Sequence, residues 1–384
     1  KSQKLPLPPL PEQRAIVAKI EQLLSELDAG IASLKKAETQ LKTYRQAVLK
    51  KAFEGELTKG WRAQQSDLPT AEALLEQIKE ERAQHHAQQL ADWAQAVKAW
   101  EAKGKEGKKP AKPKKPKEVA PLSEEELKQL PNLPEGWGWM KMGNLVKKIQ
   151  IGPFGSQLHK HDYVEQGIPI INPKHIKDGY IFPSECITKA KVDSLPQYIL
   201  NMNDIILGRR GEMGRAALIS SKENGWFCGT GSLYIRFTNF FEAKLYALIL
   251  GERRVIHYLE KKGSGTTMTN LNLGILNNLP IQVIPLPEQH QIVQEIESRL
   301  SVCDQVEASI QTGLAKAEAL RQSILKKAFE GRLLSDAELA TCKNEKDWAP
   351  ASTLLAQIEA EKAEAEAKAP KKTPKRTKKK KSVK

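Results

Sequence analysis

The chain of 384 residues is long enough for two or three domains, and its formal net charge is +15. It contains no run of 18 apolar residues, which excludes a transmembrane helix. Its four cysteines are scattered and form no CxxC pair, which argues against structural zinc or a disulfide framework. We therefore expect a protein of the reducing cytoplasm.

Most of the positive charge lies in two Lys-rich segments. Residues 103–118 hold eight basic and two acidic residues, and residues 368–384 hold ten basic and no acidic ones. Because such segments lack the apolar residues of a core, we expect them to be disordered. They would either bind phosphate groups without reading a sequence or serve only to keep the protein in solution. Residues 134–285 carry 18 basic against 12 acidic residues, so this is the folded segment expected to contact an anion.

A stretch of 48 residues occurs twice, at 10–57 and at 286–333. The two copies align without a gap and share 23 identical positions, including Leu-Pro-Glu-Gln at the start and Leu-Lys-Lys-Ala-Phe-Glu-Gly near the end. This indicates an internal duplication. Residues 1–9 resemble the apolar run that precedes the second copy. We therefore expect them to be the remnant of a preceding domain and the chain to be a fragment of a longer protein.

Each copy is predicted to form one long helix. A proline near its start (Pro11, Pro287) suits the first helical turn, and a glycine near its end (Gly55, Gly331) suits a helix stop. Apolar residues recur at heptad spacing, as expected of a coiled-coil seam. The rows of this predicted seam are Ile20, Leu27, Leu34, Leu41, Val48 and Ile16, Leu23, Gly30, Ala37, Tyr44 in the first copy, and Ile296, Cys303, Ile310, Ala317, Ile324 and Ile292, Arg299, Val306, Gly313, Leu320 in the second.

A helix of this size is about 60 Å long, which is more than one globular domain can bury. It needs a partner helix, and the chain carries a near-identical one. We therefore predict that the two copies pair with each other in antiparallel orientation. The alternative is that each copy pairs with another chain.

The segments after each copy are predicted to extend the helical part. Residues 58–102 are rich in Ala, Gln and Glu and read as helix. Residues 103–132 form a Lys/Pro-rich disordered linker with a short helix from Ser123, and residues 334–384 form a helical extension followed by the basic tail.

Residues 133–285 differ in texture from the helical parts. Short β-branched runs such as Ile168-Pro-Ile-Ile and Ser232-Leu-Tyr-Ile-Arg-Phe are separated by Gly and Asn turns. The fold class is therefore α+β. A mixed α/β globular domain is inserted between two long α-helices that pair as an antiparallel coiled coil.

The sequence offers little catalytic chemistry. Gly263-Ser-Gly-Thr-Thr lacks the lysine of a P-loop, and the histidines have no metal-ligand spacing. Glu-x-Lys occurs at Glu242/Lys244 and Glu260/Lys262, but on a predicted helix and without a strand-borne Asp, which disfavours a nuclease. We predict no catalytic, cofactor-binding or metal-binding residue on this chain.

The inserted domain instead contains three polar, basic and glycine-containing loops, at 152–161, 171–175 and 208–215. Glycine lets a backbone approach phosphate closely, arginine can read guanine through two hydrogen bonds, and Asn or Gln can read adenine in the same way. Any single side chain here can also be a solvated loop residue. Together, the three loops in one basic domain favour nucleic-acid binding.

These motifs resemble a known family. Leu133-Pro-Glu-Gly-Trp opens the domain, Gly152-Pro-Phe-Gly-Ser, Gly167-Ile-Pro-Ile-Ile and Asp204-Ile-Ile-Leu follow, and Pro285-Leu-Pro-Glu-Gln begins the second long helix. Together with Gln46 to Arg62, they resemble the DNA-specificity (S) subunit of type I restriction–modification systems, here lacking the first of its two target-recognition domains.

The resemblance implies a non-catalytic subunit that reads one half of a bipartite double-stranded DNA site, with the helix pair as spacer. It implies two adenine methyltransferase (M) subunits and restriction/translocase (R) subunits as partners in defence against foreign DNA in a bacterium or archaeon. S-adenosylmethionine, ATP and Mg would then be bound by these partners and none by this chain. A chain with one recognition domain would read a half-site or form a homodimer.

The resemblance and the loops together give candidate DNA contacts, which are Ser156, Gln157, His159, Lys160, Asn172, Lys174, Arg209, Arg210 and Thr267. We expect alanine at Arg209 or Arg210 to abolish specific binding and to leave the fold intact. Two alternatives stay open. One is a coiled-coil scaffold whose central domain binds protein while the Lys-rich tails bind DNA without specificity. The other is a standalone nuclease or methyltransferase.

Overall fold

The computed structural model describes residues 6–107, 109–113, 115, 118–211, 213–263 and 271–368. It consists of two compact units, residues 1–43 with 302–384 and residues 44–301. The helices of the described part are α1 (Leu10–Phe53), α2 (Lys59–Arg62), α3 (Ala71–Ala102), α4 (Glu124–Lys128), α5 (Lys189–Ser194), α6 (Ala243–Leu250), α7 (Arg253–Gly263), α8 (Leu273–Asn277), α9 (Leu286–Phe329), α10 (Asp336–Lys343) and α11 (Ala351–Lys368).

The strands all lie in the inserted domain. They are β1 (Gly138–Lys141), β2 (Val146–Ile151), β3 (Tyr163–Val164), β4 (Ile168–Ile171), β5 (Ile176–Lys177), β6 (Tyr180–Ile181), β7 (Cys186–Ile187), β8 (Ile205–Gly208), β9 (Ala216–Leu218), β10 (Phe227–Cys228), β11 (Ser232–Phe237) and β12 (Pro280–Val283).

Helices α1 and α9 are the two copies of the repeat, and each has 44 residues. Both end at the phenylalanine of the Lys-Lys-Ala-Phe-Glu-Gly motif. The glycine two positions later has a positive φ, 73° at Gly55 and 68° at Gly331. A left-handed residue ends a helix, and glycine adopts this conformation without the steric strain that a β-carbon would cause. The helices therefore end four residues before the predicted boundaries at Leu57 and Leu333.

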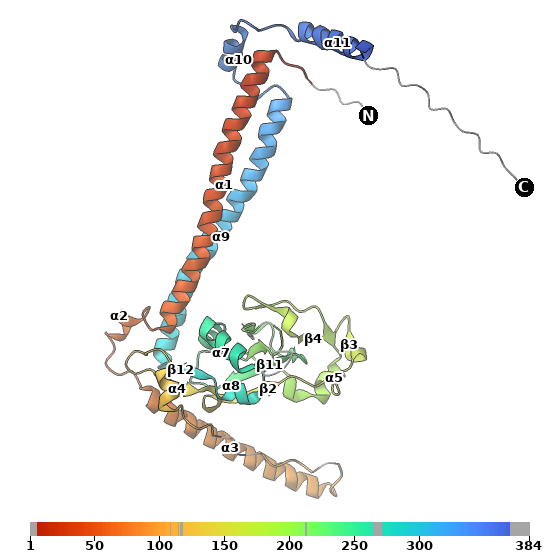
Figure 1. Cartoon of the computed structure of the whole chain (residues 1–384). Helices are drawn as coiled ribbons and strands as arrows, with labels where there is room; N and C mark the ends of the chain where they lie inside the picture. Colours follow the sequence, from red (N-terminus) through yellow and green to blue (C-terminus); the bar gives the residue numbers. More distant parts are fainter. Residues whose placement is uncertain are drawn as a thin grey trace, which may run out of the picture. The chain divides into compact units, whose positions relative to one another are not determined.

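Within the first unit, α1 and α9 lie side by side in antiparallel orientation (Figure 1). Arg321 forms an ion pair with Asp28, and the side chain of Leu34 contacts Gly313. The partner's residue number rises along α9 as it falls along α1, which defines the direction. The predicted fold class, with its antiparallel helix pair, is confirmed. Helix α10 packs beside the start of α1, where Glu338 accepts a hydrogen bond from Lys19 at 2.9 Å.

One of the two predicted seam rows on α9 is buried along its length, and of the second row Ile292 is buried. Ile296, Cys303 and Ile310 are nearly inaccessible, whereas Val306 and Leu320 of the second row are exposed. On α1, Tyr44 is likewise exposed although the heptad pattern places it in the seam. The prediction of two buried rows is therefore wrong for these residues. Heptad spacing predicts which face of a helix is apolar. A single partner helix covers only part of the width of that face.

In the second unit, the first and last strands of the inserted domain pair with each other. Strand β1 runs antiparallel to β12, with Gly138 opposite Val283 and Lys141 opposite Pro280. This pairing brings the entry and exit of the domain together. Such a domain can be inserted between two helices whose ends are adjacent, because its own termini are neighbours.

Two hydrophobic cores flank a four-stranded antiparallel sheet with the order β2-β11-β8-β9. Successive residues of β8 point to opposite faces, so Ile205 and Leu207 lie in one core and Ile206 in the other. This explains the uninterrupted apolar run in the sequence, since a strand buried on both faces needs no polar alternation. The second core also contains the smaller sheet β10-β4-β7-β3.

The described residues of the 103–132 segment contact α3. The indole Nε1 of Trp93 donates to the carbonyl oxygen of Pro110 at 3.0 Å, and that of Trp100 donates to Gly107 at 3.2 Å. The ammonium groups of Lys112 and Lys109 lie over the same two rings. The sequence does not reveal these contacts, and the disorder of the 103–132 linker stays a prediction.

Candidate nucleic-acid interface

The three loops that the sequence singles out meet at one turn, Gly229–Gly231. The amide of Gly152 donates to Ser232 beside this turn at 2.9 Å, the amide of Gly229 donates to Ile171 at 2.9 Å, and the amide of Arg209 donates to Gly231 at 2.9 Å. Segments that are far apart in the sequence are thereby joined at one end of the β8–β11 pair. The beginnings of the loops 152–161, 171–175 and 208–215 therefore lie together at this turn.

Close backbone packing at this turn requires glycine. A β-carbon at Gly152 would overlap the carbonyl oxygen of Gly229, and a β-carbon at Gly229 would overlap the side chain of Asn172. Gly231 lies similarly close to Pro173. The sequence suggests that these glycines leave the backbone open to a ligand. In the structure, they instead allow the loops to pack against one another.

Arg209 has a structural role that the sequence does not reveal. The residue is only 8% exposed, and its Nε donates to the carbonyl oxygen of Leu271 at 2.9 Å. The backbone pairs as well, since the amide of Leu271 donates to Arg209 at 3.1 Å. Alanine at Arg209 would remove a buried hydrogen bond that holds the 271 segment, so we now expect this change to cost stability as well as binding.

The electrostatics at Arg209 favour a nearby anion. Burial and then the adjacent charge of Arg210 lower the pKa of Arg209 from its ordinary value. Both effects disfavour a positive charge, so a phosphate group close by would offset them. Arg210 itself is exposed. Of the two arginines, Arg210 is the one available to a ligand.

Asn172 and Lys174 are both engaged by Glu185. The amide nitrogen of Asn172 donates to one carboxylate oxygen at 2.9 Å, and the ammonium of Lys174 pairs with the other at 2.5 Å. Next to them, His175 is buried, with Nδ1 2.9 Å from the carbonyl oxygen of Ile170 and Nε2 2.9 Å from Oγ of Ser184. These contacts fix the 171–175 loop, and they partly neutralise Lys174.

The remaining candidates of the first loop fall into two groups. Gln157 is half-buried, and its Oε1 accepts from the hydroxyl of Tyr198 at 2.9 Å, whereas Ser156 is exposed. His159 and Lys160 are exposed where the loop leads into β3, and the ring of His159 stacks on that of His161. The contacts of His159 join it to its own turn and not to the Gly229–Gly231 turn.

Thr267, the last candidate, lies outside the described residues. The structure adds two basic residues to this surface that the sequence reasoning missed. Lys177 and Arg215 line a pocket of about 400 Å³ together with Lys174 and Gly214. Arg215 also donates to the carbonyl oxygen of Pro173 at 3.3 Å. The position of Arg215 in the 208–215 loop was a usable signal, whereas Lys177 lies two residues beyond the 171–175 loop.

A buried carboxylate ties this domain to the helices. Glu288, from the Leu-Pro-Glu-Gln motif, accepts hydrogen bonds from the hydroxyl of Thr58 at 2.7 Å, from Arg62 at 2.7 Å and from the indole of Trp137 at 2.8 Å. We call these four residues the Glu288 cluster. It links the start of α9, the segment after α1 and the first turn of the domain.

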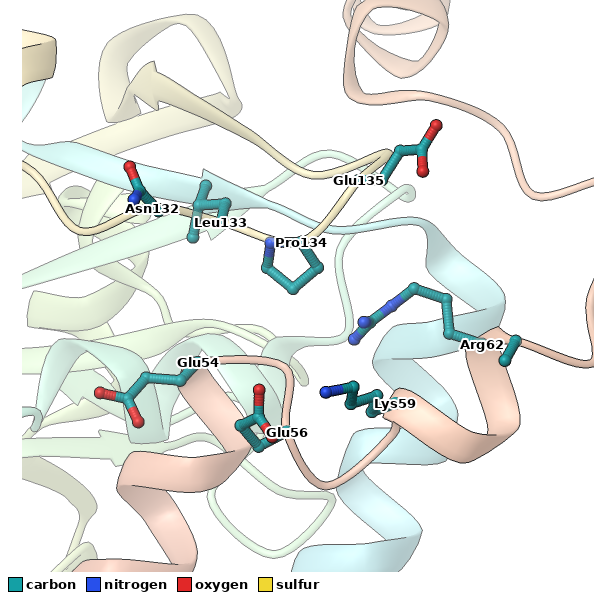
Figure 2. A pocket seen from close by; sticks show the side chains of 9 residues that line it. Glu54, Glu56, Lys59, Arg62, Asn132, Leu133, Pro134 and Glu135 are labelled. Carbon is teal, nitrogen blue, oxygen red and sulfur yellow. The ribbon is translucent and has the colours of Figure 1, made fainter.

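A cleft of about 520 Å³ opens beside the Glu288 cluster. Figure 2 shows Lys59 and Arg62, from α2, pointing into the space between the end of α1 and the loop that carries Pro134. The guanidinium of Arg62 also donates to the carbonyl oxygen of Gly55 at 2.7 Å. Arg62 thus holds the turn that ends α1.

Gln289, the next residue of the motif, is also buried. Its amide nitrogen donates to the carbonyl oxygens of Ile284 and Phe240, and its oxygen accepts from the amide of Glu242. In the first copy, Gln13 donates to the carbonyl oxygen of Pro8 at 2.8 Å, which is the equivalent contact. In both copies, the glutamine of the motif therefore joins the incoming segment to the long helix.

Within the described ranges, no group of three or more His, Cys, Asp or Glu side chains is placed to hold a metal ion. A search of the same residues for a helix long and apolar enough to cross a membrane finds none. The chemistry that this domain presents is therefore that of a binding surface with basic, amide and aromatic groups.

Comparison with known proteins shows what this domain is similar to. Residues 134–314 match the family model of the type I restriction modification DNA specificity domain. The matched segment is a little under half of the chain. The specificity domain spans the inserted domain together with the first part of α9, so it includes the loops described above and the Glu288 cluster.

Several curated specificity subunits are similar to this chain. It is 25% identical over 378 residues to the type I restriction enzyme EcoDI specificity subunit of Escherichia coli, which covers 93% of this chain and 68% of the relative. The EcoBI specificity subunit of the same species is 24% identical, with 94% and 64% covered. Over 81 residues, the identity to the StySPI specificity subunit of Salmonella potsdam is 47%. The chain thus spans about two thirds of the length of the first two relatives.

Among solved structures, the HsdS subunit from Thermoanaerobacter tengcongensis is 20% identical, with a TM-score of 0.46 and coverage of 86% of this chain and 60% of that chain. The S subunit of a type I restriction–modification system from M. genitalium is 14% identical, with a TM-score of 0.39 and coverage of 83% and 60%.

Proposed function

We propose that this chain recognises a specific sequence in double-stranded DNA as the specificity subunit of a type I restriction–modification complex, and that it reads one half of a bipartite site. The observation that carries this proposal is the meeting of the three loops at the Gly229–Gly231 turn, within the segment that matches the specificity domain. The domain also carries the excess of positive charge that a DNA-binding surface needs.

In this proposal the loops have separate tasks. Arg210 is exposed and reaches a base edge or phosphate, whereas Arg209, Asn172 and Gln157 hold the loops in place. Rigid support of this kind matters because base reading depends on side chains that are aimed before the DNA arrives. Ser156, His159 and Lys160 are exposed at the rim of the same domain and complete the set of candidate contacts.

We further propose that the chain contributes no catalytic residue and serves as a scaffold for two adenine methyltransferase subunits and for restriction/translocase subunits. S-adenosylmethionine, ATP and Mg are then bound by those partners, in the cytoplasm of a bacterium or archaeon. The names of the relatives and the match to the specificity domain support this division of labour. Copurification of the tagged chain with a methyltransferase from its native cells tests it, and recovery of the chain without one contradicts it.

Sequence reading is tested by selecting bound duplexes from a pool with a randomised segment, using the chain with its copurified partners. We expect enrichment of a short motif with defined bases. Alanine at Arg210 should then weaken binding to the enriched duplex by about tenfold or more, as expected for loss of one base-reading arginine.

Lys222→Ala is the matched control, because it removes one exposed positive charge from the same domain outside the three loops. It should change the affinity by less than about twofold. A pool without any enriched motif, or equal losses for the two variants, would contradict sequence reading and would favour non-specific binding by the Lys-rich segments.

A further inference from the structure

The hairpin formed by β5 and β6 presents two aromatic side chains to solvent. Tyr180 is 69% exposed and Phe182 is 62% exposed. The other face of the hairpin is apolar and covered, since Ile176 is fully buried and Ile181 packs against the second core. A single exposed aromatic residue is ordinary, but two residues at i and i+2 on a covered hairpin form a small apolar surface.

The register places a positive charge on this surface. Lys177 lies directly opposite Tyr180 in the antiparallel pair, and directly opposed side chains share a face. The amide of Phe182 donates to the carbonyl oxygen of His175 at 2.8 Å, so the hairpin continues for one residue beyond β6. The exposed face therefore consists of Lys177, Tyr180 and Phe182.

The hairpin is narrow and firmly held. Its turn has positive φ at Asp178 (51°) and Gly179 (80°), which is typical of the tight two-residue turn favoured in β-hairpins. A β-carbon at Gly179 would meet no atom within 4 Å, so the tip projects freely. At the base, the hydrogen bonds of His175 to Ile170 and Ser184 fix the hairpin to the rest of the domain.

The surroundings indicate an anionic partner. Among the described residues, Lys174, Lys177, Arg215 and one acidic residue, Asp178, line the pocket beside the hairpin, and Lys174 is also paired with Glu185. The hairpin also follows directly on Pro173, which packs against the Gly229–Gly231 turn where the three loops meet. An exposed aromatic pair flanked by basic side chains matches a duplex, which offers apolar base edges between two rows of phosphates.

We propose that the β5–β6 hairpin enters the major groove of the DNA, where Tyr180 and Phe182 contact thymine methyl groups and Lys177 contacts an adjacent phosphate. The major groove is wide enough for a two-stranded β-ribbon, and aromatic side chains contact the thymine methyl there. This inference rests on the proposed function, since it assigns specificity-determining residues to the same surface. It adds direct apolar reading to the hydrogen-bonded reading by the loops.

The test uses the duplex enriched by the wild-type chain and a set of copies in which each thymine is replaced in turn by uracil, which removes only the methyl group. We expect at least one replacement to weaken wild-type binding by about fourfold, as expected for the loss of one buried methyl. The double variant Tyr180→Ala/Phe182→Ala should bind the thymine duplex at least tenfold more weakly and show no further loss with uracil.

Two further variants separate the roles. Lys177→Ala should weaken binding to all duplexes alike and lower the slope of log affinity against log salt by about 1, whereas the aromatic variant should leave that slope unchanged. Met202→Ala removes an equally exposed apolar side chain elsewhere in the domain and should bind as the wild type does. Because Tyr180 and Phe182 are exposed, unchanged thermal unfolding of their variants is also expected.

The outcomes separate the two proposals. If the wild-type chain enriches no motif, the proposed function fails and the hairpin's role fails with it. If a motif is enriched but no uracil replacement weakens wild-type binding, only the hairpin inference is overturned. The same holds if the aromatic variant binds as tightly as the wild type or if its loss is additive with the uracil effect.

Discussion

The two copies of the repeat have the same closing motif in different surroundings. Phe53, near the end of the first copy, is 3% exposed and lies in the core that the inserted domain shares with the helices. Phe329, its equivalent in the second copy, is 64% exposed. The residues of the closing motif therefore do not by themselves bury its phenylalanine. What covers it is a domain docked on the end of the helix.

The two Leu-Pro-Glu-Gln motifs that open the copies also differ in burial. Glu288 is fully buried in the Glu288 cluster, whereas Glu12 at the equivalent position is only half-buried. Thr58 and Arg62, which bind Glu288, correspond in the duplication to Leu334 and Glu338, neither of which can donate a side-chain hydrogen bond to a carboxylate. The contact of the neighbouring glutamine is present in both copies. The glutamine therefore serves the helix itself, and the glutamate serves the docked domain.

The largest expected effect distinguishes the two phenylalanines. Phe53→Ala should lower the free energy of unfolding by about 3–5 kcal/mol, because it leaves a cavity in a packed core. Phe329→Ala should change it by less than about 0.5 kcal/mol, as is usual for exposed positions. Denaturant unfolding followed by tryptophan fluorescence measures both. Equal effects of the two changes would contradict the comparison.

A smaller effect is expected from the glutamates. Glu288→Ala should destabilise the protein by about 3 kcal/mol, because Arg62 and Trp137 are left buried without their acceptor. Glu12→Ala, the matched control from the other copy, should cost less than about 1 kcal/mol. Calorimetric unfolding of both variants measures the difference. A loss at Glu12 as large as that at Glu288 would show that the carboxylate serves the helix rather than the docked domain.

The smallest expected effect is on the pH dependence of the stability of the inserted domain, which covers Phe53. Burial lowers the pKa of His175 from its ordinary value near 6.5, so the folded domain holds this ring neutral. The unfolded chain then binds a proton that the folded one does not. Stability is therefore complete above about pH 6.5 and falls as the pH is lowered below it, by at most about 1.4 kcal/mol per pH unit.

His175→Gln removes this titration and should flatten the slope of the unfolding free energy between pH 6.5 and 5. The slope is compared with that of the wild type, so a general loss of stability in the variant does not affect the result. An unchanged slope would mean that His175 is not the group that protonates on unfolding. The stability of the unit that contains the exposed end of the second copy should not change in this variant, because His175 lies in the other unit.

Much of the architecture could be predicted from the residues alone. The duplication, the heptad spacing and the Gly55 and Gly331 stops predict two long helices of equal length, because helix periodicity and termination are local properties. The uninterrupted apolar run of β8 predicts a strand buried on both faces. Burial of the row that contains Ile310 was predicted correctly, whereas burial of Val306 and Leu320 in the other row was not, since the width of the covered face depends on the partner.

The candidate site was predictable only as a set of loops. Sequence composition singled out 152–161, 171–175 and 208–215, but the turn at Gly229–Gly231 that joins them was not identified, because a glycine turn has no chemical signature of its own. Arg209 and Arg210 are neighbours of the same type, and only the packing of Leu271 makes one structural and leaves the other exposed. Tyr180 and Phe182 were missed because β-branched and aromatic runs normally predict burial.

The sequence by itself determined that two equivalent helices flank a basic α/β domain with the motifs of a DNA specificity subunit, since periodicity, charge and short motifs are written in the order of residues. Tertiary structure alone decided which copy of the closing motif is buried, which of Arg209 and Arg210 is exposed, and which face of the β5–β6 hairpin is exposed. Each of these depends on what packs against a residue, and the packing partners come from distant parts of the chain.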